Sequence, residues 1–539
     1  MCGRKSLPRP ASRNYHRQRV KQIFHPSSLN EAAPEVPPPS RREWLWLSLC
    51  SVLLFAATLA LDTRHNDFPY FYHPDEAEKV RQVLTGEWNF HHPMLLLTTA
   101  QAGVAAWGVE RREQSVVQAG RWVAAGFVAA AVVGLSLLAF AWRGWTAGAA
   151  AGGALLLHHQ LFELAHYMKE DTALLMGMAW TFLAAFLFWR KPEAWRAALL
   201  GAAVALAISG KYVGVCMFAV ALPVLWGAPG RTARGWAWFW ATLAVVLVVV
   251  NLPLLLQPAL FSRSFAHEAD LVVQGQGGRR AVPHALYWSI FRDNSTPVVW
   301  VLLLVFLTMR WRERRAVSLV EWLVIAFPFA FTLLLSFSPK TNDRYFLPAS
   351  AGFTLLAALG AVDAAKLLAR RVPLRWALAV VAFVFIAAQL PDWRRYEEAF
   401  CSDDNAALLA WVQELPPDAV ISKDSRVRLP EAKSEATARH QAPIPQKVLG
   451  GHFAADHGTF AAQRARGVTH VAVSESDYGR FFLRGLGPQP GKEEEFVRRK
   501  AFYEELLRDG GEPLFRRDRG TVLYLHPGLR VYRLPPADE

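Results

Sequence analysis

The sequence WLWLSLCSVLLFAATLAL, residues 44–61, is followed by the polar stretches YHPDEAEK, residues 72–79, and WNFHHP, residues 88–93. The first stretch is uncharged, mostly apolar and long enough to cross a lipid bilayer as a helix. The other two bring adjacent carboxylates and paired histidines to the end of that helix. Because ionisable groups are costly in lipid, such residues at a membrane face are candidates for function.

The composition of the whole chain agrees with a membrane protein. Of its 539 residues, 53% are hydrophobic and only 19% are charged, whereas charged residues make up about 25% of a soluble domain. The net charge of +14 does not indicate nucleic acid, which would need a contiguous basic face. Here Arg and Lys lie in short clusters between apolar runs, as the positive-inside rule expects.

The composition changes twice along the chain and predicts three parts. Residues 1–43 are basic and rich in Pro and Ser, which predicts a disordered cytoplasmic tail. Residues 44–391 hold the apolar runs and predict a transmembrane domain. Residues 392–539 have a soluble composition and predict a small extracytoplasmic α/β domain. None of the four cysteines has the spacing of a metal site, and no disulfide framework is suggested.

The apolar runs predict about eleven membrane spans, of which the first is residues 44–61. It leaves an outer loop, residues 62–117. In that loop Pro93–Gly108 is short for a span, and we expect it to lie in the interface or re-enter it. If Pro93–Gly108 were a true span, every later loop would lie on the opposite side of the membrane. The positions of Arg and Lys in those loops fit the first choice better. The other ten spans are expected at 118–141, 146–165, 173–189, 197–208, 213–226, 236–252, 297–309, 319–337, 346–359 with its continuation, and 376–390.

Patterns in the last part predict its main elements. Residues 405–415 have helical periodicity, and residues 493–508 form a charged amphipathic helix. Short strands are expected at 418–422, 467–474, 521–525 and 530–534. The predicted fold class is therefore mainly α: a polytopic helical bundle with a small α/β domain outside the membrane.

The pair Asp75-Glu76 is the strongest candidate for catalysis. Transfer of a sugar to a hydroxyl group needs a carboxylate that takes the acceptor proton as the new bond forms. An ordinary helix start explains the pair as well, because Asp and Glu favour the first turn and His73-Pro74 precede them suitably.

Glu170-Asp171 is a second acidic pair, predicted on the same side of the membrane as the first. Two acidic loops that face one another can hold a divalent metal through oxygen ligands, or orient a sugar by hydrogen bonds. A helix start is again the alternative for this pair.

Cations and histidines lie at other outer loop edges. Lys211 and Arg344 can bind the phosphate of a donor, although Arg344-Tyr345 also fits an interfacial anchor. His91 and His92 can bind phosphate, polarise an acceptor or ligate a metal, or cap the next helix. Adjacent histidines point in different directions, which disfavours joint ligation of one ion.

The outer loop 257–296 contains His267, Glu268, several glycines and Arg279-Arg280. A glycine-rich backbone beside arginines can cradle an anion. A flexible loop without a ligand explains the same composition.

Together these stretches resemble the GT-C membrane glycosyltransferases, most closely the group of protein O-mannosyltransferases, aminoarabinose transferases and RgtA/B/C/D-like proteins. The resemblance covers about residues 44–391 and, more loosely, the C-terminal part. The chain departs from the family at Met94, where the family has a second proline, and at Glu78-Lys79, where relatives often have Arg-Tyr. The matching pieces are Pro74-Asp75-Glu76, Gly86-Glu87-Trp88, His92-Pro93-Met94-Leu95, Glu170-Asp171, Lys211 and Arg344-Tyr345-Phe346-Leu347-Pro348.

The resemblance implies transfer of a sugar, with inversion, from a polyprenyl-phosphate donor to a lipid, glycan or protein acceptor in the bacterial inner membrane. Asp75 would be the acceptor base, with Asp171 as the second acidic residue. Lys211 and Arg344 would contact the donor phosphate. Metal use differs between members of the family, so a divalent metal is left open.

The candidate residues extend beyond those four. Glu76 and Glu170 complete the catalytic set, Tyr345 and His92 complete the phosphate site, and His91 and His267 are acceptor or loop candidates. The alternative function is a polytopic transporter or lipid flippase. Such proteins tend to show an internal repeat and broken helices near the middle of the bilayer. Here the ionisable residues lie at loop edges and no repeat is visible, which disfavours this alternative. A third alternative is a scaffold without enzymatic activity.

Overall fold

The computed structural model describes residues 40–276, 279–281, 295–314, 316–340, 342–518 and 524–534. Most of the predicted tail 1–43, the pair Gly277-Gly278 and most of the predicted strand 521–525 lie outside these residues. The end of the predicted tail belongs to a helix, because α2 begins at Arg41. Ser40 caps it: its side chain accepts the N–H of Glu43, and the Glu43 carboxylate accepts the N–H of Ser40.

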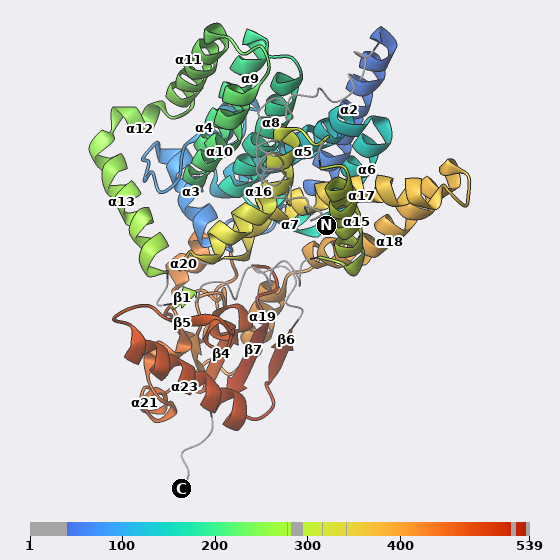
Figure 1. Ribbon diagram of the computed structural model, residues 1–539. Coiled ribbons are helices and arrows are strands. Elements are labelled where there is room, and N and C mark those ends of the chain that lie inside the picture. The colour runs from blue at the N-terminus through green and yellow to red at the C-terminus, as the bar shows by residue number, and fades with distance from the viewer. Residues whose placement is uncertain are drawn as a thin grey trace, which may run out of the picture.

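A helix lies at each of the eleven predicted spans, and together these helices form the bundle in Figure 1. Among the residues that the structure describes, seven helical segments are long and apolar enough to cross a membrane by length and composition, and the helices Ala194–Gly210 and Tyr212–Gly227 are shorter but apolar. The protein is a multi-pass integral membrane protein. The eleven helices are α2 (Arg41–Asp62), α5 (Glu113–Arg143), α6 (Trp145–Leu156), α8 (Glu170–Arg190), α9 (Ala194–Gly210), α10 (Phe218–Gly227), α11 (Ala233–Val250), α15 (Pro297–Arg312), α16 (Leu319–Ser336), α17 (Leu347–Leu368) and α18 (Leu374–Phe400).

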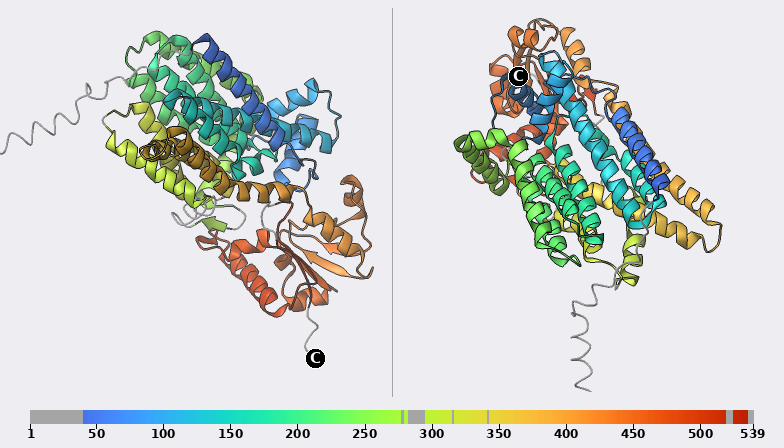
Figure 2. Two further views of the ribbon diagram at one scale, coloured as in Figure 1. Left: turned by 90° about the vertical axis from the view of Figure 1, so that its right-hand side faces the viewer. Right: turned by 90° about the horizontal axis from the view of Figure 1, so that it is seen from above.

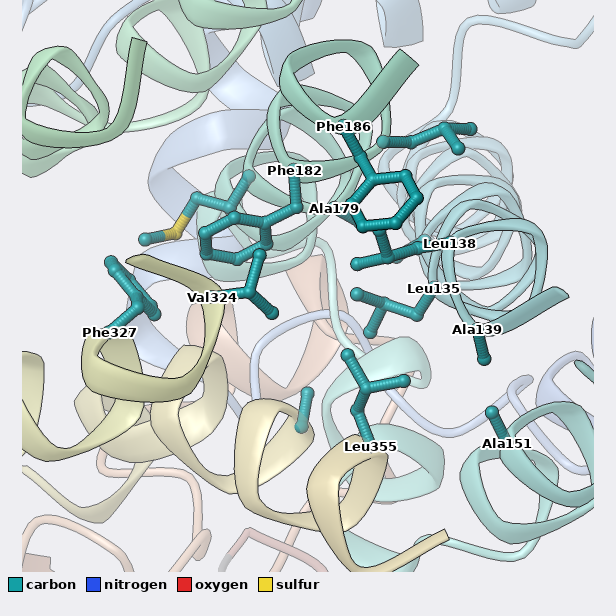
Figure 3. Packing of buried hydrophobic residues seen from close by; sticks show 14 of the residues in the cluster. Leu135, Leu138, Ala139, Ala151, Ala179, Phe182, Phe186, Val324, Phe327 and Leu355 are labelled. Carbon is teal, nitrogen blue, oxygen red and sulfur yellow. The ribbon is translucent and has the colours of Figure 1, made fainter. Parts of the chain in front are cut away.

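The bundle is centred on α5, α8 and α17, whose apolar side chains interdigitate with those of α16. Figure 3 shows this packing, with Leu135, Phe182 and Leu355 meeting from three helices. Glycines allow helix backbones to approach closely elsewhere in the bundle. A Cβ at Gly177 would lie 2.2 Å from the backbone of Ala207 in α9. Small residues at helix contacts are typical of membrane bundles, where close packing replaces the hydrophobic effect.

Two predicted segments differ from expectation. The predicted span 146–165 consists of two helices, because α6 ends at Leu156 and α7 (His159–Ala165) starts after His158. His158 caps α7 by accepting the N–H of Leu161. The first half of the predicted loop 257–296 is helical: α12 (Leu252–Leu256) leads into α13 (Pro258–Gln274). The strand β1 (Arg279–Ala281) follows.

The outer loop 62–117 contains two helices, α3 (Pro74–Thr85) and α4 (Leu95–Ala106). The 12 residues of α4 extend about 18 Å, which is less than the hydrocarbon thickness of roughly 30 Å. Two short 3₁₀ segments directly precede helices of the bundle. The segment η2 (Tyr212–Met217) leads into α10, and η3 (Asp343–Phe346) leads into α17.

The C-terminal part is built on a five-stranded sheet with the order β3 (Lys447–Leu449), β2 (Val420–Lys423), β4 (His470–Ser474), β7 (Leu529–Arg533) and β6 (Phe515–Arg517). The strand β2 runs parallel to β3 and β4, and β7 runs antiparallel to β4 and β6. The predicted helices at 405–415 and 493–508 correspond to α19 and α23, and three of the four predicted strands to β2, β4 and β7. The strands are β2 (Val420–Lys423), β3 (Lys447–Leu449), β4 (His470–Ser474), β5 (Leu486–Pro488), β6 (Phe515–Arg517) and β7 (Leu529–Arg533). The helices are α19 (Asp404–Gln413), α20 (Lys433–Ala438), η4 (Ala454–His457), α21 (Phe460–Ala465), α22 (Glu475–Tyr478), η5 (Gly479–Phe481) and α23 (Glu493–Asp509).

This α/β part lies against one end of the helix bundle, as Figure 2 shows in two further views. The antiparallel pair β1–β5 joins the segment after α13 to the C-terminal part. The Tyr72 hydroxyl donates to Asp403 at 2.6 Å, and the Arg428 guanidinium donates to the carbonyl of Tyr72. These contacts fix the start of α3, which is the part of the outer loop that carries the first acidic pair.

Candidate functional site

The first acidic pair opens α3. Nδ1 of His73 accepts the N–H of Asp75 at 3.1 Å, and Pro74 takes the first helical position. The sequence HPDE therefore is a helix start in the physical sense: a cap, a proline that has no N–H to leave unpaired, and two acidic residues in the first turn. This local role leaves open what each carboxylate contacts.

The Glu76 carboxylate is enclosed by protein groups. Its two oxygens accept from Arg121 of α5 at 3.0 and 2.7 Å, and one also accepts the N–H of Met168 at 2.7 Å. Neither charged side chain is exposed to solvent. Arg121 also donates to the carbonyls of Asn66 and Phe68. Glu76 thus joins α3, α5 and the segment before α8, and it has no open side toward a substrate.

The Asp75 carboxylate, in contrast, is 40% exposed and reaches the open side of α3. It forms an ion pair with Lys169 and lies 3.5 Å from a terminal nitrogen of Arg344. Burial opposes the charge, but Lys169 and its neighbours hold the pKa of Asp75 well below its usual range. Asp75 is therefore ionised at neutral pH and can accept a hydrogen bond from a substrate.

The second acidic pair opens α8, and its two carboxylates have different partners. Glu170 lies 2.8 Å from both Lys79 Nζ and His92 Nε2. Asp171 lies 2.5 Å from Lys211 Nζ and 3.7 Å from Nε of Arg344. Arg344 thus lies between Asp75 of the first pair and Asp171 of the second.

We call these interacting groups the charged cluster: Asp75, Lys79, Lys169, Glu170, Asp171, Lys211 and Arg344. It contains four cations and three carboxylates. Burying a charge without a partner is costly, so the extra cation favours the binding of an anion. Lys211 and Arg344 are partly open, with side chains 15% and 16% exposed.

Two of the cations are tuned by their neighbours. Burial and the nearby Arg344 lower the pKa of Lys169 to about 8. Burial also acts against the charge of Lys211, but Asp171 raises its pKa above the usual value. Lys211 further lies 4.4 Å above the ring of Tyr345, and the Arg344 guanidinium lies 5.5 Å from the same ring. Tyr345 therefore orients both cations through its ring face.

The predicted histidine candidates lie beside the cluster. His91 Nδ1 lies 3.6 Å from Glu268, whose other oxygen accepts from Lys340 at 2.7 Å. The rings of His91 and His267 are 5.6 Å apart. His92 contacts Glu170, as described above, so the two adjacent histidines point to different partners, as the sequence analysis expected.

Within the residues that the structure describes, no group of three or more His, Cys, Asp or Glu side chains is arranged to hold a metal ion. The acidic pairs face lysine and arginine instead of one shared ion. The described part of the predicted anion loop is also different, because His267 and Glu268 belong to α13.

The structure brings Asp75, Glu170, Asp171, Lys211, Arg344, Tyr345 and His92 to one end of the bundle. Sequence reasoning did not assign roles to Arg121, Lys79 or Lys169. Arg121 could have been recognised from the sequence as a candidate, since it is an ionisable residue inside an apolar run. The evidence for Lys169 was weaker, because only its position next to an acidic pair marks it. Lys79 follows the first acidic pair by one helical turn, the spacing at which side chains share a face.

No family model and no curated protein matches the chain. Among solved structures, the chain is similar to ArnT from Cupriavidus metallidurans bound to undecaprenyl phosphate, with 15% identity over 81% of this chain and 94% of that chain and a TM-score of 0.48. It is also similar to the oligosaccharyltransferase AglB from Archaeoglobus fulgidus in complex with an inhibitory peptide and a dolichol-phosphate, with 11% identity, coverage of 82% and 71%, and a TM-score of 0.46. A third similarity is to the S. cerevisiae protein O-mannosyltransferase Pmt1–Pmt2 complex bound to the sugar donor, with 18% identity, coverage of 50% and 38%, and a TM-score of 0.32.

Proposed function

We propose that this protein is an inverting membrane glycosyltransferase that moves a sugar from a polyprenyl-phosphate donor to a hydroxyl group of a lipid, glycan or protein. The observation that carries the proposal is the position of Asp75. It is an ionised, partly open carboxylate that contacts Lys169 and Arg344 inside a cluster with one excess cation. A base for the acceptor and a site for the donor phosphate are thereby adjacent.

The reaction uses these groups as follows. The donor phosphate binds to Arg344 and Lys211, which charge-assisted hydrogen bonds favour. The acceptor oxygen attacks the anomeric carbon and forms the new glycosidic bond, while its proton passes to Asp75. The bond from the anomeric carbon to the phosphate oxygen breaks, and the phosphate keeps the electron pair. The leaving group departs already ionised, so it needs cations around it rather than a general acid.

Phosphate binding also makes Asp75 a better base. In the free protein, Lys169 and Arg344 lower its proton affinity. A phosphate bound to Arg344 competes with Asp75 for this cation and adds negative charge nearby, and both effects raise the pKa of a carboxylate. The base thus gains strength when the donor is in place.

We propose that Glu76 and Glu170, the neighbours of Asp75 and Asp171, position other groups. This proposal revises their assignment as catalytic residues. Both oxygens of Glu76 are bound by Arg121, and those of Glu170 are bound by Lys79 and His92. A carboxylate enclosed in this way cannot take a proton from a substrate without breaking its ion pair. Asp171 retains its expected part as a second acidic group, because it holds Lys211 and Arg344 in place.

We further propose that the charged cluster faces the extracytoplasmic side. The helices α8 and α17 leave the cluster and carry cations near their other ends, at Arg190 and Lys366. Arg143 at the end of α5 pairs with Asp363 of α17 at 2.8 Å, at the same end of the bundle. This distribution of cations agrees with the positive-inside rule and with a cytoplasmic N-terminus.

The experiment is a release assay with the purified protein in nanodiscs. A panel of polyprenyl-phosphate-linked hexoses and pentoses is supplied with envelope lipids or glycans as acceptors, and free polyprenyl phosphate is measured. We expect one donor to be consumed. General-base catalysis contributes about 10²–10⁴-fold, so Asp75→Asn should lower turnover by that factor without weakening the binding of decaprenyl phosphate.

Asp67→Asn is the matched control, because Asp67 is an exposed carboxylate of the same outer loop. Folding of each variant is checked by its thermal midpoint. Wild-type turnover in a folded Asp75→Asn variant would contradict the base assignment. Movement of the lipid between leaflets of proteoliposomes without any release of polyprenyl phosphate would favour the flippase alternative.

A further inference from the structure

A turn in the C-terminal part exposes two adjacent apolar side chains. It follows η5 and precedes β5, and it carries Phe482 and Leu483, which are 40% and 53% exposed. The other large apolar side chains that are exposed in the described C-terminal part, Val497, Leu507 and Leu514, have no such neighbour in sequence. Single exposed apolar residues are normal on a soluble surface, whereas an adjacent pair marks this turn as a candidate contact.

The turn is attached firmly to the core of the C-terminal part. Phe481, the residue before the pair, is buried, and its ring packs against that of Phe453. The N–H of Leu486, after the pair, donates to the carbonyl of Leu483 at 3.2 Å and closes the turn. Phe482 and Leu483 are therefore presented outward by an ordered turn, although the apolar core begins at the residue before them.

Two paired strands connect this turn to the end of a membrane span. Leu486 of β5 pairs with Ala281 of β1. The N–H of Ala281 donates to the carbonyl of Pro339 at 2.9 Å, and Pro339 lies three residues beyond the end of α16. Figure 1 shows β1 and β5 at the junction between the bundle and the C-terminal part. The turn thus belongs to the side of the C-terminal part that adjoins the end of α16.

The end of α16 indicates where the apolar layer of the membrane stops. Leu333, Leu334 and Phe337 are 50–56% exposed, as expected for side chains that face lipid. Pro339 follows Phe337 by two residues, which span at most about 7 Å. The headgroup layer on each side of a bilayer is about 5–8 Å thick, because a whole bilayer measures about 40–45 Å and its hydrocarbon core about 30 Å. This places Pro339 and the strand bonded to it at the depth of the lipid headgroups.

Two exposed arginines accompany the apolar pair. Arg484 follows Leu483 directly, and Arg280 lies in the paired strand β1. The end of α13, which leads into β1, adds the exposed side chains of Val272 and Val273. Apolar side chains that enter the boundary of the acyl chains, next to cations that attract lipid headgroups, are typical of protein segments that lie on a membrane. A phospholipid surface offers both kinds of contact.

We infer that the C-terminal part binds the lipid bilayer through this turn. Phe482 and Leu483 enter the leaflet that adjoins the C-terminal part, and Arg484 and Arg280 bind the phosphates of its lipids. The C-terminal part is then held at two places, by Tyr72 at the start of α3 and by phospholipid at this turn. The inference does not depend on the proposed glycosyl transfer.

The experiment measures the depth of a fluorescent label in nanodiscs. Leu483→Cys is labelled with nitrobenzoxadiazole in a full-length chain whose four native cysteines are replaced by alanine. We expect blue-shifted emission and strong quenching by lipids that carry a nitroxide near the headgroup. The thermal midpoint of each labelled chain shows that it is folded.

Leu514→Cys is the matched control, because Leu514 is the same residue type and is 51% exposed. Its N–H donates to the carbonyl of Val531 near the end of β7, and Figure 1 shows the C-terminus, which follows β7, pointing away from the bundle. A label at this position should show neither the blue shift nor the quenching.

A charge reversal tests the arginines. Arg484→Glu in the chain labelled at position 483 brings a negative charge to the lipid phosphates and should remove most of the quenching. Arg533→Glu, at an exposed arginine at the end of β7, should leave it unchanged. Quenching that Arg484→Glu does not reduce would overturn the assignment of phosphate binding to the arginines.

A second measurement follows the strand pair itself. Replacing both Phe482 and Leu483 by Ser should speed amide exchange at Ala281 and Leu486 in nanodiscs about 10-fold or more, since burying one such apolar side chain contributes at least that factor. Leu514→Ser should change nothing there. A purely structural role of two exposed side chains predicts unchanged exchange.

The inference is overturned if the folded chains labelled at 483 and 514 give the same emission and the same lack of quenching. Protection of the label at 483 from iodide in water, without quenching by the lipid nitroxides, would assign the turn to a protein partner and overturn the inference as well. Neither result would affect the proposed function, which the release of polyprenyl phosphate tests separately.

Discussion

The acidic pairs at the starts of α3 and α8 have the same two residue types in reversed order, Asp75-Glu76 and Glu170-Asp171. They differ in exposure and in the cations that they contact. In the first pair, one carboxylate is enclosed by Arg121 and the other is 40% exposed. In the second pair, both are buried, and each has lysine as a close partner. The first pair therefore has one free position for a substrate, whereas the second mainly holds cations in place.

Helix geometry explains why neighbours in one pair differ. Successive residues of an α-helix point about 100° apart, because 3.6 residues make one turn. When a helix start lies against a bundle, one residue of a pair must face its neighbours and needs a partner there. In α3 this residue is Glu76. Two adjacent carboxylates at a helix start can therefore have different environments and different roles.

The largest expected effect concerns the enclosed carboxylate. Glu76→Ala would leave the Arg121 guanidinium buried without its counter-charge, and breaking a buried ion pair in this way costs about 3–5 kcal/mol. We expect a greatly lowered thermal midpoint and poor recovery of folded protein. Glu78→Ala is the control, because Glu78 is in the same helix but pairs with Arg81 at the surface. Equal stability of the two variants would remove the distinction between Glu76 and its neighbours.

The next effect tests the second pair as a holder of cations. Lys211→Gln removes one charge-assisted hydrogen bond to the proposed donor phosphate, worth about 1.5–3 kcal/mol, which corresponds to a KM increase of roughly 10- to 150-fold. The thermal midpoint should fall less than in Glu76→Ala, since Asp171 keeps Arg344 as a second cationic partner, 3.7 Å away. The control is Lys191→Gln, an exposed lysine at the other end of α8. A lowered kcat with an unchanged KM would argue against phosphate binding by Lys211.

The smallest expected effect is a pH dependence of ligand binding, caused by Lys169, which contacts Asp75 of the first pair and precedes Glu170 of the second. Lys169 has a pKa of about 8, below its usual 10.5, so it is charged below pH 8 and becomes neutral above it. Binding of decaprenyl phosphate should weaken as pH rises through about 8, by at most 10-fold per unit. The unfolded chain still binds this proton up to about pH 10.5, so the same group makes folding more favourable between pH 8 and 10.5.

Binding and stability should thus change in opposite directions above pH 8, which calorimetric titrations and thermal midpoints between pH 7 and 9.5 can measure. Lys169→Met should bind more weakly at pH 7 and lose the pH dependence. An unchanged slope in this variant would assign the titration to another group.

Much of the candidate site was predictable because its residues interrupt a strong pattern of apolar runs. The apolar runs set the helices, and every candidate residue except His267, which belongs to α13, lies at the edge of a run or in the first outer loop. The contact between Tyr72 and Asp403 could not be predicted in the same way, because these residues lie 331 positions apart.

The sequence by itself determined a membrane bundle, because 3.6-residue helices of apolar side chains are the stable form of such runs in lipid. It also determined which residues are candidates, because charges are rare and costly there. Only the tertiary structure decided that Asp75 is the open carboxylate, which cations each pair meets, and that the C-terminal part holds the start of α3 at Tyr72. Those choices depend on how helices are rotated and docked against one another, and contacts between distant segments leave no local pattern in the chain.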